Sequence, residues 1–254
     1  MGNANLDMQN PSDQGGVTIR PEEAEFFADL AKGWWNPKGK MASLHQVNPV
    51  RLAFIRAAVD AHFGVERENV RPLAGKSALD IGCGAGLVCE PLARLGATVT
   101  GVDAAAENVS AAASHAKAGG LDIRYMAGEV STLDIGTFDL VTSLEVIEHV
   151  ADKRAFLAEL AARLSDHGLL VLSTPNRTAA SRILLVEAAE AVGYVPKGTH
   201  HWEDFITPDE LEELLGEVGL EVINQRGIAW RPGKSLHLSD DEALNYILTA
   251  RHQS

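Results

Sequence analysis

The chain has 254 residues, of which 46% are apolar and 22% are charged. This composition is that of a soluble globular protein and excludes collagen-like, disulfide-scaffold and largely disordered chains. The formal net charge of -13 argues against nucleic acid as a partner, because so acidic a surface repels phosphate backbones. The two cysteines, Cys83 and Cys89, are too few for a disulfide framework and are typical of a reduced, cytosolic compartment.

The first twenty residues are polar and have no apolar core, which argues against a signal or transit peptide. No window of the sequence approaches the ~20 apolar residues that a membrane span requires. We therefore predict a disordered leader over residues 1–20 and a cytoplasmic protein that at most lies peripherally on the inner face of the membrane. The rest, 21–254, is expected to be a single domain.

Two helices are predicted in an N-terminal cap that covers residues 21–70. An acidic start and apolar spacing indicate a short amphipathic helix over residues 21–35. Pro49 is expected to open a second helix that runs to about Phe63, with Leu52, Ile55 and Val59 in its apolar stripe.

Short β-rich runs then alternate with helical segments in a core that covers residues 77–175. Strands are predicted at 78–81, 98–102, 123–126, 138–143 and 169–173, and helices at 87–95, 105–118 and 153–164. A C-terminal part, 208–254, adds a helix at 208–218 and two late strands, about 220–230 and 244–251, expected to form a hairpin at the sheet edge. This alternation predicts βαβ units and a three-layer, doubly wound, mainly parallel α/β sheet.

An insertion of more than thirty residues, 176–207, follows the fifth predicted strand, where a short connection is usual. Its segment 179–195 is rich in Ile, Leu, Val and Ala and is flanked by Arg177, Arg182 and Lys197. Two interpretations stay open. The segment is either a helix that packs on the domain or covers the active site, or a lid whose apolar face also meets lipid or a greasy substrate tail.

A glycine loop with Gly82, Gly84 and Gly86 follows the first strand and precedes a helix, the context in which such a loop binds a cofactor. In a dinucleotide site the pyrophosphate would lie at this loop, where Asp80 would repel it. S-adenosylmethionine, which carries an ammonium and a sulfonium group, would instead be attracted. Asp103, at the end of the second strand, can accept hydrogen bonds from ribose hydroxyls. Either acid alone could equally be a helix cap or a solvated loop residue.

Together, the loop and the two acids resemble the class I methyltransferases, whose cofactor is S-adenosylmethionine. The resemblance implies a Rossmann-like, seven-stranded sheet with one antiparallel strand, which suits the late strands. It also implies that the segment after the third strand passes the adenine, with Glu129 as a candidate for its amino group. Leu144, at the end of the fourth strand, would be a wall of the adenosine pocket.

An acidic cluster, Glu145, Glu148 and His149, follows the fourth strand. If Glu145 opens a helical turn, all three share one face, and two carboxylates with an imidazole suit Mg²⁺ or Mn²⁺. Alternatively, His149 acts alone as a general base, or the acids complement a helix N-terminus. A phenol, with a pKa near ~10, is mostly unreactive at neutral pH. A cation bound to adjacent oxygens would stabilise the phenolate, which predicts a catechol or hydroquinone acceptor.

Segments outside the cofactor core resemble one family, the ubiquinone-biosynthesis O-methyltransferases, over about residues 22–251. The segments are Trp34-Trp35, Leu44-His45-Gln46-Val47-Asn48-Pro49-Val50-Arg51-Leu52, Glu145-Val146-Ile147-Glu148-His149-Val150, Ser173-Thr174-Pro175-Asn176-Arg177, Val195-Pro196-Lys197-Gly198-Thr199-His200 and Asn245-Tyr246. The resemblance implies O-methylation of a polyprenylated catechol and of the late demethylubiquinol. It places S-adenosylmethionine on Arg51, Gly82, Asp103 and Leu144, and Mg²⁺ on Glu145, Glu148 and His149.

The same resemblance suggests what the insertion does and which partners the protein has. The apolar face of residues 179–195 could open at the bilayer surface and admit an isoprenoid tail. A quinone-biosynthesis complex is the partner that the family implies. Three rivals remain: a methyltransferase for another small phenolic acceptor, an NAD-dependent dehydrogenase, and a non-catalytic scaffold of such a complex.

Overall fold

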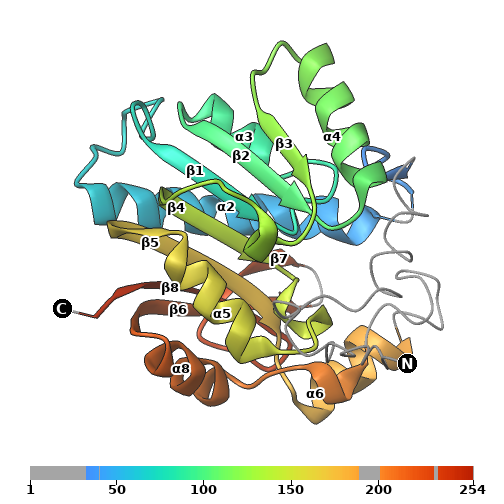
Figure 1. The fold of residues 1–254 in the computed structure, drawn as a ribbon. Helices are drawn as coiled ribbons and strands as arrows, with labels where there is room; N and C mark the ends of the chain where they lie inside the picture. The colour runs from blue at the N-terminus through green and yellow to red at the C-terminus, as the bar shows by residue number, and fades with distance from the viewer. Residues whose placement is uncertain (1–32, 40, 189–200, 232–233, 254) are drawn as a thin grey trace, which may run out of the picture.

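The structure, a computed structural model, describes residues 33–39, 41–188, 201–231 and 234–253. Its strands are β1 (Ser77–Ile81), β2 (Thr98–Asp103), β3 (Arg124–Ala127), β4 (Phe138–Leu144), β5 (Leu164–Pro175), β6 (Leu220–Arg231), β7 (Lys234–Ser239) and β8 (Asn245–His252). They form an eight-stranded sheet in the order β3-β2-β1-β4-β5-β8-β6-β7 (Figure 1). The first five strands are parallel. β8 pairs antiparallel with β5 and β6, and β7 pairs antiparallel with β6.

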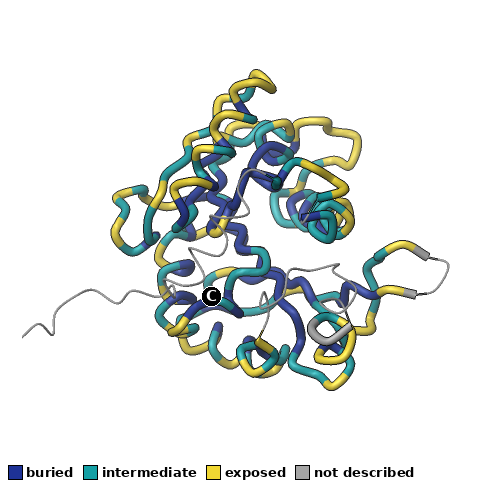
Figure 2. The backbone as a smooth tube through the Cα atoms, turned by 90° about the vertical axis from the view of Figure 1, so that its right-hand side faces the viewer, coloured by how far each residue is buried: buried dark blue, intermediate teal, exposed yellow. Residues whose placement is uncertain are grey.

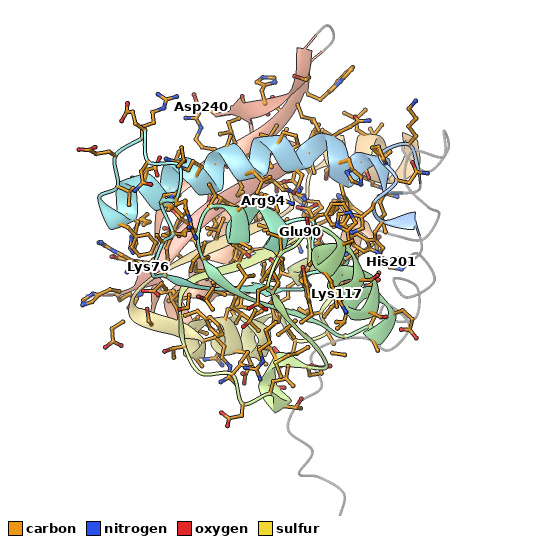
Figure 3. The ribbon with its side chains drawn as sticks, turned by 90° about the horizontal axis from the view of Figure 1, so that it is seen from above. Lys76, Glu90, Arg94, Lys117, His201 and Asp240 are labelled. Carbon is orange, nitrogen blue, oxygen red and sulfur yellow. The ribbon has the colours of Figure 1, made fainter. Side chains whose placement is uncertain are left out.

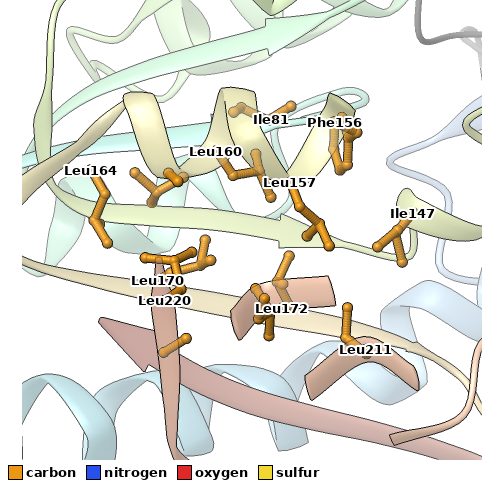
Figure 4. Close-up of a cluster of buried hydrophobic side chains, with 14 of the residues drawn as sticks. Ile81, Ile147, Phe156, Leu157, Leu160, Leu164, Leu170, Leu172, Leu211 and Leu220 are labelled. Carbon is orange, nitrogen blue, oxygen red and sulfur yellow. The ribbon is translucent and has the colours of Figure 1, made fainter. Parts of the chain in front are cut away.

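Helices cover both faces of this sheet, so the predicted three-layer architecture is confirmed. They are α2 (Ala42–Phe63), α3 (Cys89–Arg94), α4 (Ala106–Ala118), α5 (Lys153–Ala162) and α8 (Pro208–Glu217). On one face α5 and α8 pack Leu157 and Leu211 onto the strands (Figure 4). On the other face α2, which lies across the sheet in Figure 3, packs Ile55 together with Leu92 of α3. Burial concentrates in the strands and the inward faces of the helices (Figure 2).

The late strands differ from the prediction in number and in place. β7 was not expected, so the sheet has eight strands rather than seven; β6 and β8 do pair antiparallel, but β7 separates them in the chain and forms the edge. β8 lies between β5 and β6 because its residues 246–250 are buried on both faces, as in a central strand. The missed strand carries a short alternation in which Leu236 and Leu238 pack against the core beneath α2.

The predicted start of the second helix at Pro49 is wrong, since α2 begins at Ala42. A proline inside a helix lacks the N–H that would bond one turn back. Here the helix continues because Val47 and Val50 pack against the core, and because the Asn48 side chain donates to the carbonyl of Leu87 at 3.0 Å. The predicted leader and nearly all of the predicted helix at 21–35 lie outside the described residues, apart from a turn at its end.

The insertion is described as far as residue 188. It forms a short helix, α6 (Ala179–Ser181), followed by a π-helical segment, η4 (Arg182–Ala188). The rest of the predicted 179–195 helix lies outside the described residues. The amide of Asn176 donates to the carbonyl of Leu244, and the hydroxyl of Thr178 donates to that of Ala243. The insertion therefore begins at the sheet edge where the parallel strands end and β8 starts.

Candidate active site

The glycine loop crosses the carboxyl end of β1 in a conformation that only glycine adopts easily. Gly82, Gly84 and Gly86 have φ values of 72°, 51° and 87°, in the left-handed region. None of the three has room for a side chain, and a Cβ on Gly86 would lie 2.3 Å from the hydroxyl oxygen of Tyr125. A Cβ on Gly82 would lie 2.3 Å from Cγ2 of Val146, and a Cβ on Gly84 would lie 2.5 Å from Cη2 of Trp34. At these three positions the loop at the end of β1 thus presents backbone atoms without side chains.

Asp103, at the end of β2, lies beside this loop as predicted. One of its carboxylate oxygens accepts a hydrogen bond from the amide of Gly84 at 2.8 Å. The other accepts from the amide of Ala105 at 3.0 Å and from the side chain of Asn108 at 3.1 Å. Burial raises the pKa of Asp103, although these three donors oppose the rise. The carboxylate is therefore held at the loop by several donors.

Asp80 lies beneath the loop, buried to 3% exposure. Its carboxylate accepts from the hydroxyl of Thr142 at 2.6 Å and from the thiol of Cys89 at 3.3 Å. Burial raises the pKa of Asp80 to about 6, and the nearby charge of Asp103 contributes to the rise. Burial makes the ionised form of Asp80 unfavourable, so a cation bound above the loop would stabilise that form.

Glu145 stands in the turn that follows β4 and has a φ of 57°; no other non-glycine residue described has a positive φ. Its carboxylate meets the guanidinium of Arg51 at 2.8 Å. It also accepts from the hydroxyl of Ser173 at 2.9 Å and, on both oxygens, from the side-chain amide of Asn245 at 3.0 Å. Residues of α2, β5 and β8 thus converge on one carboxylate.

Glu148 and His149 lie on the next turn, the 3-10 segment η3 (Ile147–His149). The carboxylate of Glu148 is almost fully buried and accepts from the hydroxyl of Thr174 at 2.9 Å. Its other oxygen lies 3.9 Å from Nε2 of His149. Burial, together with the charge of Glu145, raises the pKa of Glu148 to about 7, whereas His149 lowers it. The facing carboxylate oxygen of Glu148 lies close to the imidazole without a hydrogen bond to it.

The expected common helical face of Glu145, Glu148 and His149 is not formed. The left-handed turn at Glu145 precedes η3, so its carboxylate is directed at Arg51 while that of Glu148 is directed at Thr174. Within the described ranges, no group of three His, Cys, Asp or Glu side chains is arranged to hold a metal ion. In this conformation the acidic cluster therefore does not fit Mg²⁺.

The two remaining predicted residues lie at the same edge. Leu144 ends β4 and is half-buried against the core beneath α2. Glu129 precedes the 3-10 turn η2 (Val130–Thr132) after β3 and is half-buried.

Sequence reasoning did not assign site roles to Ser173, Thr174 or Asn245, although the segments that contain them carried the resemblance. Ser173 and Thr174 could have been found, because they lie at the carboxyl end of β5, where α/β sheets place their chemistry. Asn245 could not, because it begins an antiparallel strand whose place beside β5 is set by long-range pairing.

Comparisons with known proteins identify the family of this chain. Residues 58–225 match the family model described as "Methyltransferase domain". The chain is 44% identical over 239 residues to the ubiquinone biosynthesis O-methyltransferase of Azorhizobium caulinodans, covering 92% of this chain and 94% of that protein. The chain belongs to this family. The enzyme of the same name from Paramagnetospirillum magneticum is 43% identical over 234 residues, with 91% and 94% covered.

Solved structures support the fold. Magnesium protoporphyrin IX methyltransferase from Synechocystis with bound SAH gives a TM-score of 0.63 at 20% identity, covering 91% of this chain and 96% of that one. The PH0226 protein from Pyrococcus horikoshii gives 0.60 at 14% identity, covering 90% and 99%. The predicted class I methyltransferase fold is therefore confirmed, and as a member of the family above the chain is an S-adenosylmethionine-dependent O-methyltransferase.

The residues at this edge fit that cofactor. The glycines of the loop leave its backbone without side chains at three positions, and the carboxylate of Asp103 is held beside it by the amide of Gly84. The Nε–H of Arg51 is buried and has no hydrogen-bond partner among the described residues. A buried donor of this kind usually has a partner, so it is suited to an acceptor on a ligand.

Proposed function

We propose that this enzyme methylates a hydroxyl of a polyprenylated catechol or demethylubiquinol in ubiquinone synthesis. The names of its relatives support the pathway, and one observation carries the chemistry: a buried carboxylate, Glu148, lies beside His149 at the cofactor edge of the sheet. In the reaction the acceptor oxygen bonds to the methyl carbon as the carbon–sulfur bond breaks. The phenolic proton is lost, and S-adenosylhomocysteine leaves as a neutral thioether.

The protein must supply a base that accepts the phenolic proton of the acceptor. Because a phenol has a pKa near ~10, it needs a base at neutral pH. We assign this role to the imidazole of His149. Glu148, with its facing oxygen at 3.9 Å and a pKa of about 7, stabilises the imidazolium that results. Glu148 has no need to contact the acceptor itself.

The remaining residues bind and orient the cofactor, which supplies its methyl group as a sulfonium when bound. Asp103 holds the ribose, and the half-buried Leu144 and Glu129 border the adenine. Asp80 stabilises the cationic methionine part from beneath the loop. Glu145 orients Arg51, whose unpaired Nε–H would donate to the carboxylate of the ligand.

Dependence on Mg²⁺ stays a prediction, and no step of the proposed chemistry passes through a metal ion. For Glu145 to ligate a cation, it must first release Arg51, Ser173 and Asn245. We therefore expect Mg²⁺ to bind only weakly to this cluster. Activity measured with Mg²⁺ and with EDTA tests this. Equal activity in both leaves Glu145 and Glu148 with hydrogen-bonding roles and His149 as the base alone.

For the isoprenoid tail we propose the π-helical segment η4. Ile183 and Leu184 are 54% and 47% exposed, which is unusual for large apolar side chains adjacent to one another. No helix in the described part of the chain is long and apolar enough to cross a membrane, so contact with a bilayer would be peripheral. Replacing Ile183, Leu184 and Leu185 with Ser should abolish flotation with liposomes. Unchanged flotation removes the proposal.

The function is tested with purified protein, S-adenosylmethionine and a short-tailed demethylubiquinol under reducing conditions, with methylated product followed by mass spectrometry. We expect turnover that His149→Ala lowers by at least ~10²-fold, whereas His167→Ala, at the opposite end of the sheet and exposed, leaves turnover unchanged. Turnover only with soluble catechols would redirect the assignment to another phenolic acceptor. Cofactor binding without turnover on any quinol would favour a scaffold of a quinone-biosynthesis complex.

A further inference from the structure

Two adjacent tryptophans are fixed over the glycine loop by contacts that the catalytic proposal does not use. The indole N–H of Trp35 donates to the carbonyl of Ala85 in the loop at 3.0 Å. Its ring stacks on His115 of α4, with centroids 3.5 Å apart and planes 6° apart. His115 in turn bonds to the buried carboxylate of Glu90 at 2.6 Å; Glu90, on α3, is labelled in Figure 3. Trp35 thus ties its segment to the loop and to α4.

Trp34 lies against the loop itself. Its ring fills the space that a Cβ on Gly84 would need, and it packs with Met41 and Leu87 in a small apolar cluster. Its backbone carbonyl is held by Nε2 of His45 at 2.7 Å. The side chain is 7% exposed, yet its Nε1–H has no hydrogen-bond partner in the described part of the chain.

That unpaired N–H is unusual and costly. A buried tryptophan normally finds an acceptor for its indole N–H. A buried donor without a partner forfeits its hydration. The packing of the ring and the anchored carbonyl leave Trp34 little freedom to turn the N–H elsewhere. The position is therefore kept at a cost when no ligand is bound.

A second unpaired donor borders the same loop from the other side. Val146 packs against Gly82, and the residue before it, Glu145, holds Arg51, whose Nε–H is also without a partner among the described residues. Both unpaired groups can only donate, so both require an acceptor. The loop is therefore bordered by two buried donors, one on the indole whose ring packs on Gly84 and one on the arginine paired beside the turn that abuts Gly82.

We propose that the Nε1–H of Trp34 donates a hydrogen bond to the carboxylate of the methionine part of S-adenosylmethionine, which makes Trp34 a cofactor-binding residue. This inference rests on the proposed function. The cofactor offers acceptors in its adenosine and in its carboxylate. The ribose is assigned to Asp103 and the adenine to the segment after β3, which leaves the carboxylate for donors that border the loop. A charged acceptor also gives the stronger bond.

The test compares two ligands on one pair of variants. Trp34→Phe keeps an aromatic ring at this position and removes the N–H together with part of the buried indole. Binding is measured by calorimetry for S-adenosylhomocysteine and for 5′-methylthioadenosine, which shares the adenosine and the thioether but lacks the amino-acid carboxylate. We expect Trp34→Phe to weaken S-adenosylhomocysteine about 10-fold, which is about 1.4 kcal/mol, and to leave 5′-methylthioadenosine unchanged. Trp35→Phe, which loses a bond to the loop backbone, should affect both ligands alike.

Stability gives a readout that a purely structural role would not produce. Trp34→Phe should therefore lower the urea midpoint more with saturating S-adenosylhomocysteine than without ligand, because the lost hydrogen bond then adds to the cost of the smaller buried ring. Equal loss for both ligands, or no loss for S-adenosylhomocysteine, overturns the inference. If the variant fails to fold, NMR of the wild type decides: the Trp34 indole proton should shift downfield with S-adenosylhomocysteine and not with 5′-methylthioadenosine. A wild type that binds neither ligand refutes the proposed function itself.

Discussion

The guanidinium of Arg51 lies 2.8 Å from the carboxylate of Glu145, and the two side chains are only 5% and 16% exposed. Arg51 comes from the middle of α2, whereas Glu145 stands in the turn after β4. The pair therefore joins the N-terminal cap to the edge of the sheet that carries the cofactor loop. An ion pair this deeply buried depends on both members, because either charge alone would be left without compensation.

Glu145→Gln should therefore lower the free energy of unfolding by about 3 kcal/mol, since it leaves the charge of Arg51 buried and unpaired. Urea unfolding measures the change. Glu221→Gln is the matched control, because its pair with Arg251 has side chains that are 39% and 48% exposed. That variant should cost less than about 1 kcal/mol. Equal losses of stability would show that burial does not determine how much the Arg51–Glu145 pair contributes to the free energy of unfolding.

Asn245 should matter to activity through Glu145 alone. Asn245→Ala removes the amide that bonds both carboxylate oxygens, and we expect kcat/KM to fall by ~10- to 100-fold, the size expected for hydrogen bonds to a charged group. Asn245→Asp should be worse at pH 8 than at pH 6, because it places a second carboxylate against the first. Gln225→Ala on β6, which loses only a bond to Glu242, should retain activity. An active Asn245→Asp enzyme at pH 8 would contradict this account.

The pKa of Asp80 predicts a pH dependence of stability. Its carboxyl has a folded-state pKa of about 6 against an ordinary 3.8, so the folded protein binds the proton more tightly than the unfolded chain. This contribution to stability is present at low pH, falls as the pH rises from about 4 to 6, and stays constant above that. The total is about 3 kcal/mol.

Asp80→Asn should remove that decline. The difference in unfolding free energy between the variant and the wild type, measured by urea from pH 4 to pH 8, should therefore grow in favour of the variant. The same substitution should weaken S-adenosylmethionine, because the ionised carboxylate stabilises its positive charges. A difference that does not change with pH would show that Asp80 does not titrate in this range.

Gly82→Ala separates backbone strain from crowding. Gly82 and Gly75 have similar φ values, 72° and 77°, but a Cβ would meet Val146 at 2.3 Å in the first case and nothing within 4 Å in the second. Gly75→Ala should cost about 1–2 kcal/mol from strain alone. Gly82→Ala should cost more and abolish cofactor binding. Adding Val146→Ala should recover part of the lost stability, and no recovery would rule out the clash as its cause.

Much of the cofactor edge could be predicted from the sequence because local patterns specify it. Alternation of β-rich and helical runs placed β1 to β5, and the rule that ligands bind at the carboxyl ends of parallel strands brought Asp103 to the glycine loop. These inferences need only the period of the hydrophobic pattern and the residues at the ends of elements.

The acidic cluster was harder to predict because its geometry is decided elsewhere. The segment Glu145–His149 resembles the first turn of a helix, but Glu145 adopts a left-handed conformation while its carboxylate bonds to Arg51, Ser173 and Asn245. Those partners come from α2, β5 and β8, so no local rule indicates them. The strand β7 was missed for the same reason. Its apolar alternation is too short to predict a strand by itself, and the strand forms because its side chains pack beneath α2.

The position of β8 has a consequence for biosynthesis. It follows every other described strand in the chain, yet it pairs in the interior of the sheet, between β5 and β6. While the ribosome is still making it, both neighbours have open edges that can pair with other chains. Its arrival covers both edges and brings Asn245 to Glu145 in one event. The protein thus becomes resistant to aggregation at the same moment as its acidic cluster is completed.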